Sequence, residues 1–240
     1  RSWDLRLVVC TKTEQPTPFG ILTNGAQDPE TSQSISWLSG IATSAAKAQV
    51  KYSENADLSG AAIAEGTSEI VTFVQSTSGD ALRVNRVTVS GLTAGKTYYF
   101  QVGDGTESGW SEINTFRTAD ASAKSTDFFI LGDIQSTNTV YLSRALTELA
   151  KQPYDYDFAI QTGDAIDQVA EYTKYWVPFL NIVNAGSLGG TDLIHALGNH
   201  EYYGDADGSI SGAIYDLPQS AQNSWYTMDY GKVSVTVINH

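Results

Sequence analysis

The first hundred residues alternate apolar and polar positions in short runs that turn residues separate. The alternation is clearest over 34–38 (SISWL) and 48–52 (AQVKY), and Asn-Gly, Ser-Gly and Ala-Gly pairs follow at short intervals. Because the side chains of a strand point alternately to its two faces, this period of two predicts strands that each bury one face. Many short strands with frequent turns favour a β-sandwich. Within it, we expect 86–90 and 97–102 to pair as a hairpin.

Residues 21–118 resemble a fibronectin type III domain. The resemblance rests on Trp37 in an early strand and on the pattern Val87-x-Val-x-Gly-Leu-x-x-Gly-x-x-Tyr-x-Phe-x-Val102. We expect Trp37, Tyr98 and Phe100 to pack in the core of this domain. Residues 1–20 are then expected to form an N-terminal extension.

The pattern changes after 119–126, a stretch of small and polar residues without a period that predicts a linker. The continuous apolar run at 128–132 is typical of a strand buried on both faces, and 157–162 and 192–197 predict two further strands. Apolar residues at three- and four-residue steps predict helices over 141–149 and over 169–183, the second kinked or broken at Pro178. Runs at 224–230 and 233–239 predict a closing hairpin. The predicted fold is therefore an all-β sandwich at 21–118 followed by an α/β domain at 127–240.

Each of the three predicted central strands runs into a short polar motif. Phe128 to Gln135 reads FFILGDIQ, 158–167 reads FAIQTGDAID, and 193–201 reads LIHALGNHE. Open α/β sheets bind ligands at the carboxyl ends of their strands, where Asp133, Asp164 and Asn199 would stand. Two neighbouring carboxylates repel each other, and a bound cation relieves that repulsion. The alternative is that each Asp caps the helix that follows it.

The third motif adds an amide oxygen and an imidazole. Asn199 offers a neutral hard ligand for a second metal bridged through Asp164, while His200 is placed to donate a proton or hydrogen bond to a phosphoryl oxygen. We expect Glu201 to orient these groups rather than to bind metal. Oxygen ligands and one imidazole at adjacent strand ends predict a di-metal site that hydrolyses phosphate esters.

Charge and composition limit the classes of partner. The formal net charge of −13 argues against a nucleic-acid-binding surface, and it would repel a phosphoester unless a metal supplies positive charge. The sequence has no run of apolar residues long enough to predict a membrane span. With Cys10 as the only cysteine, no intrachain disulfide forms; the acidic, lysine-poor composition predicts an extracellular or cell-surface protein.

Residues 127–240 resemble the amino-terminal half of a calcineurin-like metallophosphoesterase, and the preceding sandwich makes the chain similar to purple acid phosphatase-like enzymes. The resemblance implies a partial α/β/β/α domain and two metal ions, with iron, manganese, zinc and magnesium left open. Asp133 would bind the first metal, Asp164 would bridge, and Asn199 would bind the second. His200 would assist metal-bound hydroxide in attacking the phosphorus of a small phosphoester.

Three departures from the family pattern qualify this interpretation. Asp167 stands where purple acid phosphatases have the tyrosine that colours them, and Gln135 stands where related enzymes have a histidine. We treat both residues as possible neighbours of the ligands and predict a protein that is not purple. The downstream histidines of the family are missing, and His240 is read as the point where the sequence stops, midway through the catalytic domain. We therefore expect this chain alone to be inactive and its incomplete sheet to need a partner chain.

Two other functions stay open at this stage. The chain could be a non-catalytic extracellular binding or structural module with a degenerate phosphoesterase domain, which Gln135, Asp167 and the missing histidines favour. A nucleotide-binding α/β domain is disfavoured, because no glycine-rich phosphate loop follows a strand.

Overall fold

The computed structural model describes residues 18–41, 47–73, 81–107, 109–135, 139–186, 188, 190–218 and 225–238. Most of the predicted N-terminal extension, Cys10 and His240 therefore lie outside the described residues. In the described segments no helix is both long and apolar enough to cross a membrane.

The N-terminal part is a β-sandwich, as the period-two pattern predicts. One sheet has the order β5-β6-β2-β1 and the other the order β4-β3-β7-β8. The strands are β1 (Phe19–Asn24), β2 (Ser32–Gly40), β3 (Gln49–Ser53), β4 (Ala62–Glu65), β5 (Thr67–Thr72), β6 (Ala81–Ser90), β7 (Thr97–Gly103) and β8 (Asn114–Arg117). Trp37, Tyr98 and Phe100 are buried in the core between the sheets, as predicted.

The expected hairpin of 86–90 with 97–102 is wrong. β6 pairs with β2 and β5, whereas β7 pairs with β3 and β8, so the connection crosses from one sheet to the other. The hydroxyl of Tyr98 accepts a hydrogen bond from the backbone N–H of Thr93 at 3.0 Å and so holds this corner. Corners of this kind between sheets are common in sandwiches, and an alternating pattern alone does not distinguish them from a hairpin.

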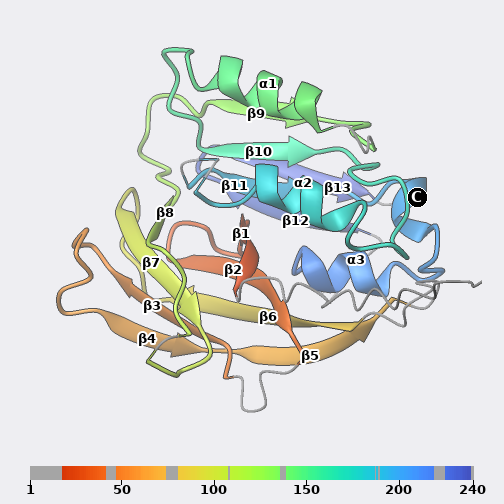
Figure 1. The fold of residues 1–240 in the computed structure, drawn as a ribbon. Helices are drawn as coiled ribbons and strands as arrows, with labels where there is room; N and C mark the ends of the chain where they lie inside the picture. The colour runs from red at the N-terminus through yellow and green to blue at the C-terminus, as the bar shows by residue number, and fades with distance from the viewer. Residues whose placement is uncertain are drawn as a thin grey trace, which may run out of the picture.

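The C-terminal part is α/β. Its elements are β9 (Phe128–Leu131), α1 (Val140–Leu149), β10 (Phe158–Gln161), α2 (Trp176–Ile182), β11 (Asp192–His195), the 3₁₀ turn η1 (Asn199–Tyr202), α3 (Ser209–Ile214), β12 (Trp225–Tyr230) and β13 (Val233–Ile238). Strands β9, β10 and β11 are parallel neighbours, and β12 with β13 forms the predicted antiparallel hairpin (Figure 1). Helix α2 is shorter than predicted: Pro178 lies in its first turn, where a missing N–H costs little.

The two parts share one sheet, which the sequence pattern does not predict. β1 runs parallel to β11 with Asn24 opposite Leu193, and this contact joins four sandwich strands to three α/β strands in the order β5-β6-β2-β1-β11-β10-β9 (Figure 1). The backbone N–H of Gly25 donates to the carbonyl of Leu193 at 3.3 Å. Apolar residues of β1, β2 and β6 also belong to the same buried cluster as α2 and β10. The predicted two-part architecture is thus confirmed, with the parts packed as one unit.

Some apolar side chains of β9 and of the hairpin β12-β13 are exposed to solvent. On β9, Phe128 is 41% exposed and Ile130 is 61% exposed. On the closing hairpin, Trp225 is 60% exposed and Ile238 is 74% exposed, although the opposite face of β12 buries Tyr226, Met228 and Tyr230 against the parallel sheet. Apolar side chains on β9 and on the outer face of the hairpin therefore contact solvent in this chain.

Candidate metal and phosphoester site

Three parallel strands end at one edge of the sheet, and each leads into one of the three predicted motifs. Leu131, Gln161 and His195 are the last residues of β9, β10 and β11, and they lie opposite one another in register. The loops that carry Asp133, Asp164 and the Gly198-Asn199-His200 sequence therefore leave the sheet side by side (Figure 1). Parallel pairing alone brings these three segments to a common edge.

Both motif aspartates have the left-handed backbone conformation. The φ angle of Asp133 is 50° and that of Asp164 is 54°, while Gly163 just before the second has a φ of 101°. An L-residue other than Gly adopts this region at a cost, and Asp and Asn tolerate it better than most residues. The chain therefore bends at the aspartates themselves and, in the second motif, also at Gly163. Backbone strain of this kind gathers at functional sites.

Backbone hydrogen bonds join the first two loops. The N–H of Asp133 donates to the carbonyl of Gly163 at 3.3 Å, and the N–H of Gln135 donates to the carbonyl of Asp164 at 2.9 Å. The side-chain amide of Gln135 also donates to the carboxylate of Asp133. Gln135 thus lies against the first aspartate, in the neighbourhood where the sequence placed it.

The second and third loops meet through the carboxylate of Asp164. Its Oδ1 atom accepts the backbone N–H of His200 at 3.0 Å. A Cβ atom at Gly198 would stand 2.2 Å from that same oxygen, so only glycine permits the approach. Asp164 therefore does not cap a helix that follows it, as the alternative interpretation held; it holds the start of η1. Its Oδ2 atom makes no hydrogen bond with any residue in the described part of the chain.

Glu201 connects the loop of Asp164 with the loop of Asn199. Its carboxylate is fully buried and accepts three backbone N–H groups, from Asp164, Ala165 and Gly198, each at 2.8 Å. Burial raises the pKa of Glu201, while those three N–H groups act in the opposite direction. With both oxygens occupied by backbone donors, Glu201 fixes the geometry of two motifs rather than facing the edge of the sheet.

The side chains of Asn199 and His200 in the third motif are each held by one neighbouring residue. The amide nitrogen of Asn199 donates to the hydroxyl of Tyr203 at 3.0 Å, which leaves the amide oxygen for a metal. The Nδ1 atom of His200 lies 2.8 Å from the backbone carbonyl of Asp167 and 3.5 Å from its carboxylate. Because a carbonyl only accepts, the ring carries a proton on Nδ1 and presents Nε2 elsewhere. Asp167, expected near the metals, thus contacts the imidazole.

The donor set fits hard metal ions. It consists of two carboxylates and one amide oxygen at adjacent loops, with an imidazole beside them, and oxygen donors of this kind suit hard cations such as magnesium and manganese. Among the described residues, no group of three or more His, Cys, Asp or Glu side chains gathers as a metal cage. The set therefore depends on the amide of Asn199 and provides few protein ligands for two metals.

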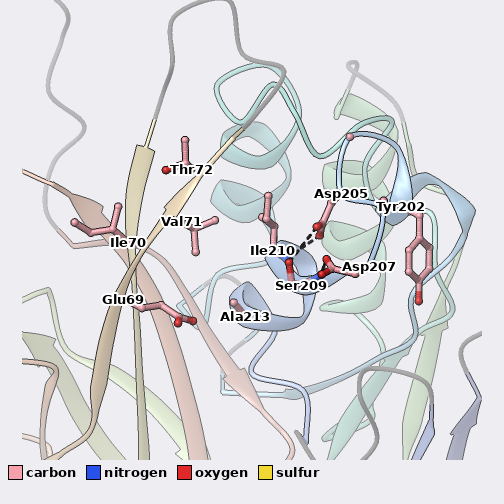
Figure 2. A pocket seen from close by; sticks show the side chains of 12 residues that line it. Glu69, Ile70, Val71, Thr72, Tyr202, Asp205, Asp207, Ser209, Ile210 and Ala213 are labelled. Atoms are coloured by element: carbon pink, nitrogen blue, oxygen red, sulfur yellow. Dashed lines mark hydrogen bonds between the residues drawn. The ribbon is translucent and has the colours of Figure 1, made fainter.

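A separate cavity of about 780 Å³ lies between β5 and the segment 202–213 (Figure 2). Acidic side chains line it, namely Glu69 from β5 and Asp205 and Asp207 from the loop before α3, and Asp205 also accepts the N–H of Ile210 at 2.7 Å. None of the four motif residues lines this cavity. The candidate donor residues at the strand ends are thus separate from this cavity.

Sequence reasoning missed one contributor to this region, Tyr203, and one buried carboxyl at the opposite end of β11, Asp192. Tyr203 holds Asn199, and its ring centroid lies 4.7 Å from that of His200. Tyr203 stands four residues after Asn199, about one helical turn further along the chain, so the sequence could have suggested its hydroxyl as a partner for the Asn199 amide. The fully buried Asp192, at the start of β11, bonds to Gln33 and Tyr230, and its sequence neighbours give no sign of either partner.

Comparison with known proteins agrees with this description. Residues 18–118 match the family model for the purple acid phosphatase N-terminal domain. No curated protein sequence matches the chain. Among solved structures, a purple acid phosphatase, PPD1, from yellow lupin (Lupinus luteus) seeds has a TM-score of 0.69 at 15% identity, over 93% of this chain and 45% of that one. PhoD has a TM-score of 0.63 at 11% identity, over 96% of this chain and 53% of that one.

These matches cover nearly all of the present chain but only about half the length of the two structures. At such identities the likeness shows a shared fold. Together with the family model, it confirms the resemblance that the motifs predicted: the chain is similar to purple acid phosphatase-like metallophosphoesterases, with their N-terminal domain at 18–118.

Proposed function

We propose that the protein hydrolyses small phosphomonoesters or phosphodiesters at the edge formed by the ends of β9, β10 and β11. One observation carries the proposal: hydrogen bonds between backbones and from His200 to the carboxylate of Asp164 tie three oxygen-bearing loops into one cluster. Caps of separate helices would have scattered these carboxylates. The fold shared with a purple acid phosphatase and with PhoD supports the same reaction class.

In this proposal Asp133 would hold one metal ion, Asn199 would hold the other, and the carboxylate of Asp164 would serve both. Two bound metal ions would neutralise charge on the phosphoryl group and lower the pKa of a water molecule. Gln135 orients the carboxylate of Asp133 through its amide, and Glu201 keeps the loops of Asp164 and Asn199 at a fixed separation. With a protein of net charge −13, local positive charge is needed to bring a phosphoester to this edge.

His200 is the proposed proton carrier. Its Nδ1 proton is anchored on the carbonyl of Asp167, so the ring is held while Nε2 takes up or releases a proton at the substrate. A protonated Nε2 can hydrogen-bond to a phosphoryl oxygen or protonate the leaving oxygen. Asp167 thereby serves the imidazole, where purple acid phosphatases use a tyrosine to bind iron, and we expect no purple colour.

The test is hydrolysis of an aryl phosphomonoester and an aryl phosphodiester by the full-length protein after loading with each candidate metal. Asp164→Ala should abolish turnover and reduce the bound metal measured by elemental analysis. His200→Ala should lower kcat by roughly 10²- to 10⁴-fold while metal content stays unchanged. The matched control is Asp155→Ala, because that carboxylate is 89% exposed and pairs only with Arg117 on the surface.

A metal-replete protein that leaves every tested phosphoester intact would contradict the proposal. It would favour the second candidate, an extracellular binding module with a degenerate catalytic domain. The small number of acidic and histidine ligands in the described segments supports this second candidate. For the 240-residue chain by itself we propose weak metal retention and little turnover; two metals retained after dialysis against a chelator would contradict this.

We also propose that another polypeptide segment or a partner chain covers the exposed apolar residues of β9 and the closing hairpin. Phe128, Ile130, Trp225 and Ile238 support this, since such strands rarely face water in a finished sheet. The acidic, lysine-poor composition supports an extracellular location, which immunodetection in culture medium and cell fractions would test.

A further inference from the structure

A small cavity lies where the sandwich meets the α/β part. It measures about 10 Å³, and its lining includes Asn24 of β1, Leu193 and His195 of β11, and Tyr215 after α3. The described strands β1 and β11 pair here through a single register contact, Asn24 opposite Leu193. The void therefore sits directly beside the junction that makes one sheet out of two parts.

The residues around this void carry polar atoms that no protein group satisfies. Within the described segments, the Oδ1 of Asn24, both ring nitrogens of His195 and the hydroxyl of Tyr215 are buried without a hydrogen-bond partner. The three side chains are 2%, 1% and 0% exposed, so bulk water does not reach them. A buried polar group without a partner destabilises the folded state, so four such atoms on residues around one void are unusual.

The orientation of the Asn24 amide is fixed by its neighbours. Its Nδ2 atom donates to the Oγ of Ser36 at 2.9 Å, and that hydroxyl in turn donates to the carbonyl of Ile214 at 2.7 Å. Since the single proton of Ser36 is used on Ile214, Ser36 accepts from Asn24, and a flipped amide would place two acceptors face to face. The unpaired atom of Asn24 is therefore the carbonyl oxygen.

Tyr215 does not provide a hydrogen-bond partner for the ring nitrogens of His195. The two rings stack with their centroids 3.8 Å apart and their planes 11° apart, so the ring nitrogens point away from the stacked face. Burial lowers the pKa of His195 to about 3, which keeps the imidazole neutral near pH 7, with one N–H donor and one bare nitrogen acceptor.

We propose that one water molecule binds in this void, donating to the Oδ1 of Asn24 and pairing with a ring nitrogen of His195. A volume of about 10 Å³ is close to that of one probe sphere, which is the space a single buried water needs. Water both donates and accepts, as this mixed set of atoms requires, whereas a cation could only be coordinated by acceptors. The carboxylate of Asp216, which also lines the void, is already bonded to Ser34 and lies 3.8 Å from Arg86.

Such a water would bridge β1 and β11 next to their one register contact. It would add a polar cross-link between the sandwich and the strand that leads to Asn199. The proposed water site is separate from the proposed hydrolysis, because Asp133, Asp164, Asn199 and His200 do not line the void.

The test counts long-lived internal waters by ¹⁷O magnetic relaxation dispersion in the wild-type protein and two variants. His195→Phe keeps the aromatic stack but removes both ring nitrogens, and it should lose one internal water. Phe100→Leu is the control: Phe100 is fully buried in the sandwich core, has no polar side-chain atom and does not line the void. This control should keep the wild-type count. Equal counts in wild type and His195→Phe would overturn the proposal.

A high-resolution crystal structure of the wild-type protein gives a second measurement that needs no variant to fold. The expected result is an electron-density peak at about 2.7–3.2 Å from the Oδ1 of Asn24 and from a nitrogen of His195. A direct hydrogen bond between these two side chains, no peak, or a peak that refines as a metal cation would each overturn it.

Discussion

Asp192 is the buried carboxyl whose removal should most change how stability depends on pH. It is 1% exposed at the start of β11, and it accepts hydrogen bonds from Gln33 at 2.8 Å and from Tyr230 at 3.1 Å. These donors favour the charged form, but in the described part of the chain no Lys or Arg forms an ion pair with it. Burial is the larger effect and raises the pKa of Asp192 from 3.8 to about 8.

The sign follows from proton binding in the two states. Between pH 3.8 and about 8 the folded state holds a proton on Asp192 that the unfolded chain has released. The free energy of unfolding should therefore fall as pH rises through this window, by up to about 1.4 kcal/mol per pH unit from this group alone. The stabilisation is fully present below pH 3.8 and is lost by the time the pH passes the folded pKa.

His195 opposes this trend over part of the range. Burial lowers its pKa from 6.5 to about 3, so between these values the unfolded chain binds a proton that the folded state lacks. Stability should consequently fall as pH drops from 6.5 towards 3, with a slope of similar size and opposite direction. The two contributions nearly cancel between about pH 4 and 6.5. Above 6.5 only Asp192 contributes, so its effect is isolated between pH 6.5 and 8.

The assay is urea unfolding at several pH values, comparing wild type with Asp192→Asn, which is similar in shape to the neutral carboxyl. The difference in unfolding free energy between the two should change by about 1–2 kcal/mol between pH 6.5 and 8. The exposed Asp155→Asn serves as the control and should follow the wild-type curve. A wild-type to Asp192→Asn difference that stays constant across pH 6.5–8 would refute the assignment of a buried, protonated Asp192.

Three further outcomes follow from contacts at the strand ends. Gly163→Ala should lower the free energy of unfolding by about 1–3 kcal/mol in urea, because its φ is +101° and a Cβ would lie 2.7 Å from the nitrogen of Gly198; an unchanged midpoint would contradict this. Glu201→Gln should cost about 1–3 kcal/mol, since its amide would turn a donor towards backbone N–H groups, and calorimetry should detect the loss. Tyr203 is 49% exposed, so Tyr203→Phe should leave the melting temperature within about 2 °C of the wild-type value. Because the variant loses the hydroxyl that accepts from Asn199, it should bind metal roughly tenfold more weakly in a titration. Equal metal affinity in the two proteins would mean that Asn199 does not need this hydrogen bond.

Local periodicity was sufficient to predict most elements. The alternation around Trp37 and the continuous run before Asp133 became β2 and β9, as predicted. The burial expected of each strand was wrong: β2 is buried on both faces because the α/β part covers its second face, whereas β9 exposes Phe128 and Ile130. The motif positions were also predictable, since a Gly-Asp after such a strand must leave at its carboxyl end. The sequence could thus bring Asp133, Asp164 and Asn199 to one edge without any coordinates.

Long-range pairing was not predictable in the same way. Nothing in the sequence around Asn24 indicates that β1 lies beside β11, because a single register contact leaves no repeat to detect. The partners of His200 and Asn199 were hidden for a similar reason: Asp167 contacts the imidazole through its backbone carbonyl, an atom that every residue possesses. The corner held by Tyr98 was misread as a hairpin because both connections show the same turn residues.

The shared sheet gives the sandwich a direct role in positioning the proposed site. Strand β11 lies between β10 and β1, so its outer edge is covered by the N-terminal part, whereas β9 at the opposite end exposes Ile130. Without β1, the strand that leads to Gly198 and Asn199 would itself become an open edge. Because Gly198 touches Asp164 and is bonded to Glu201, a shift of β11 would move the second and third loops together. The sandwich is therefore part of the structure that fixes the strand-end geometry, and the α/β part expressed without it should lose stability together with the proposed metal affinity.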